Sequence, residues 1–248
     1  MVFGAAFLFN SCSTVTTNDT VSTQENSNTE EKTFRDTSLF LTYEWQPGTH
    51  QLSFLLNHPD GYPFKTFFAL QDHLKVQEKK LLFAMNGGMF RKDFSPVGLY
   101  VENGIELQPL ITKQEGYGNF FLQPNGVFFL REDDTPAVST TMNYDSAGVK
   151  FATQSGPMLL IDGAIHPAFN ADSENKNIRN GVGILPSGNV LFCISTRKVT
   201  FYALASFFLE KECENALYLD GFVSEAYIPE KGMAEDGGPF GVMIGVYE

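Results

Sequence analysis

Short apolar runs separated by turn residues dominate the chain from residue 39 onward and predict a strand-rich fold. Most runs are bounded by glycine, proline, asparagine or aspartate, which is typical of strands that are joined by turns. The polar stretch 131–141 is predicted to be a connection. The predicted strands cover residues 39–43, 51–56, 81–85, 96–102, 105–110, 119–123, 126–130, 149–153, 158–161, 183–185, 190–195, 216–219 and 240–246.

Turn residues indicate how several of these strands pair. Asn-Gly at 103–104, Pro-Asn-Gly at 124–126 and Pro-Ser-Gly-Asn at 186–189 each lie between two apolar runs. Because turns of this composition reverse the chain over a few residues, we expect a hairpin at each of the three positions.

Two stretches carry apolar residues at helical spacing instead. Residues 64–79 place Phe64, Phe67, Phe68 and Leu74 on one face, and Thr200 is suited to cap a helix that runs to about residue 212. We therefore predict an α+β fold: a strand-rich single domain with a mixed or antiparallel sheet, several hairpins and two main helices.

The N-terminal part differs from the rest in composition. Residues 1–12 contain a short apolar segment that ends at Cys12, the pattern of a bacterial lipoprotein signal with cleavage before the cysteine and lipid on its sulfur. Residues 13–37 are Thr, Ser, Asn and Glu with little that is apolar, so we expect a disordered polar stalk ahead of a folded domain at 38–248. A leader with an incidental cysteine is the alternative interpretation.

Charge and cysteine content exclude several classes of protein. The chain has 29 Asp and Glu against 17 Lys and Arg, which argues against binding nucleic acid or anionic lipid surfaces. Its three cysteines form neither a zinc spacing nor a disulfide framework; Cys193 and Cys213 could pair, although two free buried thiols are favoured. The four histidines show no metal spacing and are predicted on the surface or in loops, so we expect no cofactor and no metal.

Polar groups beside apolar runs are the candidates for chemistry. Arg179 directly precedes a buried strand, Asn86-Gly87 ends one, and Asp220-Gly221 follows another. A permanent cation and a carboxylate in such positions need partners or serve a ligand. A structural Arg that pairs with one of the many carboxylates, and ordinary turns at the glycines, remain open as interpretations.

Seven strings in the same order, from about Lys80 to the C-terminus, resemble the phosphodiester glycosidase domain family, in particular its bacterial branch. They are LLFAMNGGMF, SPVGLYVENG, GNFFLQPNGVFFL, ATQSGPMLLIDGAIHPAF, IRNGVGILPSGNVLFCIS, NALYLDGFVSEAY and VMIGV. Two positions depart from the common pattern. Phe222 stands where relatives commonly have a small or hydroxyl residue, and Glu225 stands where a second small residue is common.

The resemblance implies hydrolysis of a sugar-phosphate diester, such as a GlcNAc-1-phosphodiester, on its glycosidic side. It assigns Arg179 to a phosphate clamp and Asp220 to the role of nucleophile or base, with Glu225 as a second carboxylate. The substrate-binding groups would be Asn86, Gly87, Gln154, Ser155, Gly156, Asn180, Gly221 and Ser224. The partner would be a phosphorylated glycan or a sugar phosphodiester, met in the bacterial cell envelope by an exported, lipid-anchored protein. A non-catalytic envelope lipoprotein that binds phosphorylated glycans is the alternative.

Overall fold

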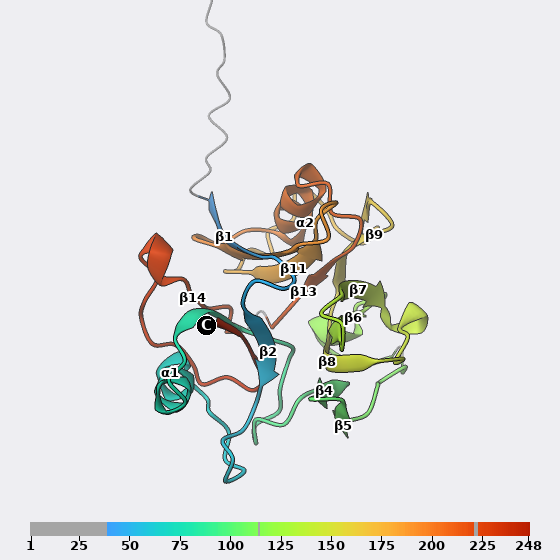
Figure 1. The fold of residues 1–248 in the computed structure, drawn as a ribbon. Coiled ribbons are helices and arrows are strands. Elements are labelled where there is room, and N and C mark those ends of the chain that lie inside the picture. The colour runs from blue at the N-terminus through green and yellow to red at the C-terminus, as the bar shows by residue number, and fades with distance from the viewer. Residues whose placement is uncertain (1–38, 114, 221–222) are drawn as a thin grey trace, which may run out of the picture. The chain divides into compact units, whose positions relative to one another are not determined.

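The apolar runs form fifteen strands in three sheets, and every pair of neighbouring strands among the described residues is antiparallel (Figure 1). The computed structural model describes residues 39–113, 115–220 and 223–248. Within residues 36–248, which make one compact unit, the strand-rich α+β prediction is confirmed and the sheets are antiparallel rather than mixed.

The largest sheet has six strands in the order β1-β12-β11-β13-β9-β10. Its hairpin at 186–189 is confirmed, since Ile184 pairs with Val190 on either side of the turn. Asn180 pairs within the sheet, so β11 begins earlier than predicted. The strands are β1 (Phe40–Trp45), β9 (Met158–Ile161), β10 (Ala164–Ile165), β11 (Asn180–Ile184), β12 (Val190–Ser195) and β13 (Ala216–Tyr218).

A second sheet has four strands in the order β14-β3-β15-β2. β3 ends at Asn86, and the final apolar run forms β15, which pairs with both β2 and β3. The strands are β2 (Gln51–Leu55), β3 (Leu81–Asn86), β14 (Ala226–Tyr227) and β15 (Met243–Tyr247). β14 was not predicted, because two residues are too few to give a periodic pattern.

The third sheet has five strands in the order β5-β4-β8-β6-β7. The hairpin at 103–104 is confirmed, since it joins β4 to β5. The strands are β4 (Tyr100–Glu102), β5 (Ile105–Gln108), β6 (Gly126–Arg131), β7 (Pro136–Thr140) and β8 (Val149–Ser155).

The predicted hairpin at 124–126 is wrong. Residues 119–121 form the short 3-10 helix η2 (Asn119–Phe121), and β6 pairs instead with β7, inside the stretch predicted to be a polar connection. Asn125 is buried, and its side chain donates to the Phe120 carbonyl at 3.1 Å and accepts from the Thr141 hydroxyl at 2.8 Å. Because these bonds fix Asn125 in the interior, it does not form an exposed turn. β7 reads as polar because it is an edge strand, in which only Val138 is buried.

Phenylalanine side chains join the three sheets in one core. Phe54 of β2 lies 5.1 Å from Phe128 of β6, measured between ring centroids, and Phe128 lies 5.8 Å from Phe192 of β12. Phe83 of β3 completes the group at 4.8 Å from Phe192, and all four rings are fully buried. The sheets are thereby held together on their inner faces, so that loops at the strand ends can meet.

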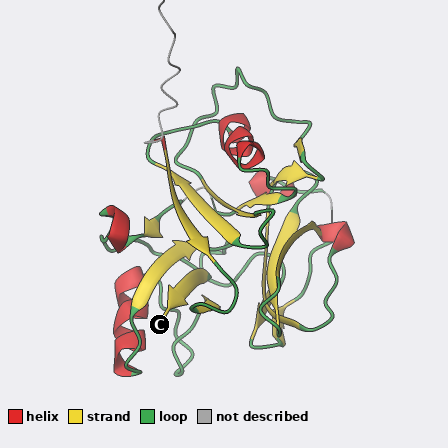
Figure 2. Ribbon diagram, turned by 45° about the horizontal axis from the view of Figure 1, so that its top comes forward, coloured by secondary structure: helices red, strands yellow, loops and turns green. Residues whose placement is uncertain are grey.

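Two α-helices cover separate sheets (Figure 1; Figure 2). α2 (Phe201–Glu210) packs on β9 and β10, and its predicted cap is confirmed, since the Thr200 hydroxyl accepts from the Ala203 N–H at 3.0 Å. α1 (Phe67–Val76) packs on β3 and is shorter than predicted. Lys65 and Glu78 have φ of 66° and 60°, outside the helical region, and so bound the helix.

Candidate functional site

Three segments that are far apart in the sequence meet at the ends of β3, β11 and β13, and a fourth begins four residues after Asp220. The Asp220 N–H donates to the Gly87 carbonyl at 3.0 Å, and the Leu219 N–H donates to the Asn180 carbonyl at 3.4 Å. The fourth segment, Ser224–Glu225, attaches through the Ser224 hydroxyl, which donates to the Asp220 carbonyl at 3.0 Å. The structure therefore brings together Asn86, Gly87, Asn180, Asp220, Ser224 and Glu225 from the predicted site.

The amide of Asn86 is the centre of this network. Its Nδ2 donates to the Asp220 carbonyl at 3.0 Å, and its Oδ1 accepts from Asn180 Nδ2 at 2.8 Å and from the Glu225 N–H at 2.9 Å. Asn86 and Asn180 are both buried. Their side chains hold the surrounding segments in position. A ligand could therefore bond only to the amide N–H groups and oxygen lone pairs that these hydrogen bonds do not use.

Arg179 is buried, with 1% of its surface exposed, and it contacts neutral groups. Nε donates to the Val199 carbonyl at 2.9 Å, and Nη2 donates to the carbonyl and the side-chain oxygen of Asn175 at 3.1 and 3.2 Å. The guanidinium carbon stacks 3.6 Å from the centroid of the Phe201 ring. Burial lowers the pKa of Arg179, and no carboxylate among the described residues forms an ion pair with it. A buried cation without a counter-ion is costly unless an anion approaches it.

Tyr218 is a neighbour of Arg179 and lies two residues before Asp220 in the chain. Its hydroxyl accepts from Arg179 Nη1 at 3.3 Å. Burial raises the pKa of Tyr218 to about 12; the charge of Arg179 lowers this pKa and that of Asp220 raises it. Asp220 is buried with 7% of its surface exposed. The hydroxyl of Tyr218 thus contacts the predicted cation, and the charge of the predicted carboxylate influences its pKa.

Glu225 is half-buried beside a cavity of about 380 Å³. Its Oε2 accepts from the Gly238 N–H at 3.2 Å. Burial raises the pKa of Glu225, the Gly238 hydrogen bond lowers it, and the charge of Asp236 raises it further. The cavity is lined by Phe67, Ile178, Ile194, Ser195, Thr196, Ser224, Glu225, Ala226, Gly232, Met233, Glu235 and Asp236. Its hydroxyls, carboxylates and apolar side chains are groups that suit a sugar.

The segment 154–156 lies beside the network rather than within it. The Gln154 amide accepts from the Leu99 and Ile111 N–H groups, each at 3.0 Å, and donates to the Ile111 carbonyl at 2.8 Å and the Thr141 hydroxyl at 3.0 Å. Ser155 Oγ is buried and has no hydrogen-bond partner among the described residues. The next residues reach the site, because the Tyr218 N–H donates to the Pro157 carbonyl at 3.1 Å.

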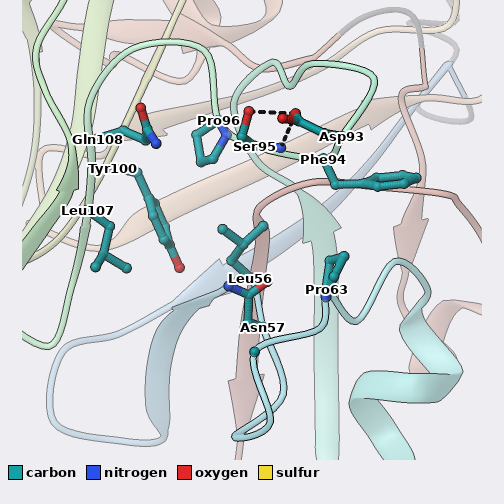
Figure 3. Close-up of a pocket in the computed structure, with 11 residues that line it drawn as sticks. Leu56, Asn57, Pro63, Asp93, Phe94, Ser95, Pro96, Tyr100, Leu107 and Gln108 are labelled. Atoms are coloured by element: carbon teal, nitrogen blue, oxygen red, sulfur yellow. Dashed lines mark hydrogen bonds between the residues drawn. The ribbon is translucent and has the colours of Figure 1, made fainter.

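Another pocket, of about 330 Å³, contains none of the predicted site residues (Figure 3). Figure 3 shows it between Leu56 and Pro63 on one side and Pro96 and Tyr100 on the other, with the Asp93 carboxylate turned to Ser95. It offers neither a cation nor a group of carboxylates, and so it lacks the chemistry that the sequence predicts.

Sequence reasoning missed Tyr218, Asn175 and Phe201, which surround the guanidinium. Tyr218 could have been found from strand alternation, because positions two apart on an extended chain face the same side and Tyr218 is two residues before Asp220. Phe201 gave no signal, since it looks like any other apolar residue of an amphipathic helix.

Gly221 and Cys12 lie outside the residues that the structure describes. Among the described residues no group of three His, Cys, Asp or Glu side chains is arranged to hold a metal ion, and no helix has the length and apolar character to cross a membrane. His166 lies in a loop, in line with the prediction, and it is buried there, with Nε2 2.9 Å from the Gln123 carbonyl and Nδ1 accepting from the Ala168 N–H.

A strand-rich domain that gathers a guanidinium, a carboxylate and amides where its strands end has the layout of a site for an anionic, hydroxyl-rich ligand. The phosphodiester glycosidase family model matches residues 79–247. The chain therefore belongs to the phosphodiester glycosidase family.

One relative in sequence and two solved structures of similar fold match this chain. The uncharacterized protein YigE of Escherichia coli K12 is 35% identical over 205 residues, which are 82% of this chain and 80% of YigE. The catalytic domain of zebrafish N-acetylglucosamine-1-phosphodiester alpha-N-acetylglucosaminidase, auto-inhibited by its pro-peptide, matches with a TM-score of 0.54 and 16% identity over 86% of this chain and 85% of that one. A protein of Burkholderia pseudomallei K96243 matches with a TM-score of 0.52 and 12% identity over 84% of this chain and 73% of that one.

Proposed function

We propose that the protein hydrolyses a sugar-phosphate diester at its glycosidic bond. The observation that carries the proposal is the buried cation of Arg179, whose contacts among the described residues are all neutral. A phosphodiester would supply the missing negative charge. Family membership and the fold shared with the zebrafish enzyme support the same reaction.

Arg179 has donors to offer a phosphate. Its four hydrogen bonds to described residues use four of the five N–H groups of a guanidinium, which leaves one on Nη1. Asn175 lies on an exposed segment, so a phosphate that displaces its two oxygens would gain the Nη2 donors as well. The unpartnered Ser155 hydroxyl and the Gly156 N–H are proposed to assist the clamp.

In the proposed reaction the bond between the sugar C1 and the phosphate oxygen breaks with its electron pair going to oxygen. Asp220 either attacks C1, forming a glycosyl ester that water then hydrolyses, or takes a proton from a water that attacks C1 directly. In both cases the products are the free sugar and a phosphomonoester. Phosphate leaves readily, so little help from an acid is needed. Glu225 is proposed as the second carboxylate, beside a sugar held in the 380 Å³ cavity with help from Ser224.

The test is to incubate the purified protein with a GlcNAc-1-phosphodiester and to measure free sugar, together with calorimetric binding of the same compound. Release of sugar is expected. Asp220→Asn is expected to abolish turnover and keep binding, and Arg179→Ala to lower kcat/KM at least about a hundredfold because charge-assisted contacts are lost.

Asp162, which is exposed, and Arg131, which is 27% exposed and pairs with the exposed Asp145, provide matched controls. Asp162→Asn and Arg131→Ala should keep wild-type kinetics. Saturable binding without release would instead make the protein a glycan-binding module. If the protein neither binds nor cleaves any sugar phosphodiester, the proposal is contradicted.

We further propose that the protein is exported and tethered to the cell envelope by a lipid on Cys12. The apolar segment before Cys12 and the polar stretch after it support this. Radiolabelled palmitate fed to an expressing bacterium should label the wild-type protein and not Cys12→Ser, and equal labelling of the two would contradict the anchor.

A further inference from the structure

The loop that joins β10 to β11, residues 166–179, contacts the guanidinium of Arg179 near its own end. Ordered loops of this length without a helix or strand are uncommon and are often functional. Its first part is anchored by stacked rings, with His166 4.7 Å from Phe169 and Phe169 5.0 Å from Phe201. Because Phe201 also stacks on Arg179, the anchor and the site share one ring.

The last part of the loop is held by backbone hydrogen bonds. The Asn177 N–H donates to the Val199 carbonyl at 3.1 Å, and the Val199 N–H donates to the Asn177 carbonyl at 2.8 Å. Between the two anchors, residues 170–176 are mostly exposed. Within the described part of the chain, the hydrogen bonds that lead out of this span all involve Asn175. The span is thus tied to the site through a single residue.

Asn175 offers Arg179 two neutral oxygens. Its main-chain carbonyl and its Oδ1 accept from Nη2 at 3.1 and 3.2 Å. Asn175 is exposed whereas Arg179 is 1% exposed, so Asn175 lies between Nη2 and solvent. Neutral oxygens satisfy the N–H groups but leave the positive charge uncancelled. An anion in their place would make the same hydrogen bonds and add the attraction of opposite charges.

We propose that Asn175 is a neutral placeholder for the phosphate of the substrate. Its two oxygens occupy Nη2 in the free protein, and they leave when phosphate binds, as residues 170–176 swing outward between the two anchors. The inference rests on the proposed function for the identity of the anion. It makes Asn175 a specificity-determining residue, because an uncharged glycoside has no charge with which to displace it from Arg179.

The direct test is titration calorimetry of the full chain with inorganic phosphate. Asn175→Ala removes one of the two competing oxygens and should lower the Kd at least about threefold. Asn175→Asp replaces the neutral placeholder with an anion and should raise the Kd at least about tenfold.

Asn170→Ala and Asn170→Asp are the matched controls. Asn170 is exposed, lies on the same span, and its side chain accepts from the Asp172 N–H at 2.9 Å without contacting Arg179. Both controls should bind phosphate within about twofold of wild type. Equal phosphate affinity in Asn175→Ala and Asn170→Ala, or no phosphate binding by either, would overturn the placeholder.

Thermal unfolding without phosphate gives an independent measurement. Asn175→Asp places a carboxylate against a buried cation, so the Tm at neutral pH should rise by about two degrees or more. Pairing with a cation lowers the pKa of a carboxyl group, so the gain should be lost as pH falls toward about 3. Asn170→Asp should show no gain. An Asn175→Asp protein no more stable than wild type would also overturn the placeholder.

Kinetics separate this proposal from the proposed function. On a GlcNAc-1-phosphodiester, Asn175→Asp should raise KM at least about tenfold and keep kcat within about twofold, because the placeholder leaves before the bond breaks. A wild-type protein that releases no sugar, with the phosphate affinities and Tm values in the expected order, would overturn the proposed function and leave the role of Asn175 standing.

Discussion

Asn180 and Asn86 join two sheets by a side-chain hydrogen bond of 2.8 Å, from Nδ2 of Asn180 to Oδ1 of Asn86. One residue starts β11 and the other ends β3, and they are 94 positions apart in the chain. The side chain of Asn86 also bonds to the backbones of Asp220 and Glu225. The Asn pair therefore fixes the positions of the loop that carries Asp220 and the segment that carries Glu225.

Asn86→Ala is therefore expected to cost at least about 2 kcal/mol of unfolding free energy, since buried groups of Asp220, Asn180 and Glu225 lose their partner together. Urea denaturation measures this. Asn143 is exposed, and Asn143→Ala should stay within about 0.5 kcal/mol of wild type. Equal midpoints for the two variants would show that Asn86 does not hold the segments.

Gly88 is expected to tolerate a side chain far less well than Gly87. A Cβ on Gly88 would press on the carbonyl oxygen of Gln154 and lie 2.6 Å from Thr153 Oγ1, whereas on Gly87 the nearest atom is a Val242 methyl at 3.1 Å. Gly88→Ala should cost roughly 2–3 kcal/mol and Gly87→Ala about 1 kcal/mol, both by thermal unfolding. If Gly87→Ala proved more destabilising than Gly88→Ala, the loop would not pack against β8.

Glu225 gives a pH dependence with a defined sign. Burial raises its pKa above the ordinary 4.5, so the folded protein holds this proton more tightly than the unfolded chain does. The contribution to stability is present below pH 4.5 and is lost as pH rises through the folded value. Glu225→Gln keeps an acceptor for the Gly238 N–H and carries no charge next to Asp236.

The Tm of Glu225→Gln should accordingly exceed that of wild type at neutral pH by about one degree, and the difference should shrink toward pH 4. Scanning calorimetry across this range is the measurement. A variant that is less stable than wild type at neutral pH would mean that the carboxylate is stabilised by its surroundings.

Cys193 and Cys213 are free and buried in the structure, as the composition favoured. Burial raises the pKa of Cys193 well above its usual value and that of Cys213 to about 11. In Cys12→Ser protein at about pH 8, neither thiol should react with Ellman's reagent until the protein is denatured, because the thiolate is the reactive form. Rapid reaction of the native protein would show that the helix over these residues opens.

Sequence patterns were sufficient to predict the structural features that depend on residues close together in the chain. The turn at 186–189 and the Thr200 cap follow from residues a few positions apart, and both are confirmed. The end of a strand is also local, so the sequence could name Asn86 and Asp220 as candidates.

Contacts between distant residues could not be predicted in the same way. Asn125 looks like a turn residue until Thr141 and Phe120 bind its side chain. The charge of Arg179 was visible in the sequence, but its stacking on Phe201 and its bond to Tyr218 depend on how α2 and β13 pack. The roles given to the site residues remain predictions.

The four-stranded sheet has a consequence for synthesis. Its order, β14-β3-β15-β2, inserts residues 243–247, the last of the described strands, between two strands made much earlier. Because a ribosome delivers the chain from its N-terminus, a nascent chain carries every candidate site residue before β3 and β2 have the neighbour that joins them. Competence for binding should thus appear late and all at once, after translation has passed β15, so that a polypeptide stalled a few codons short would be inert.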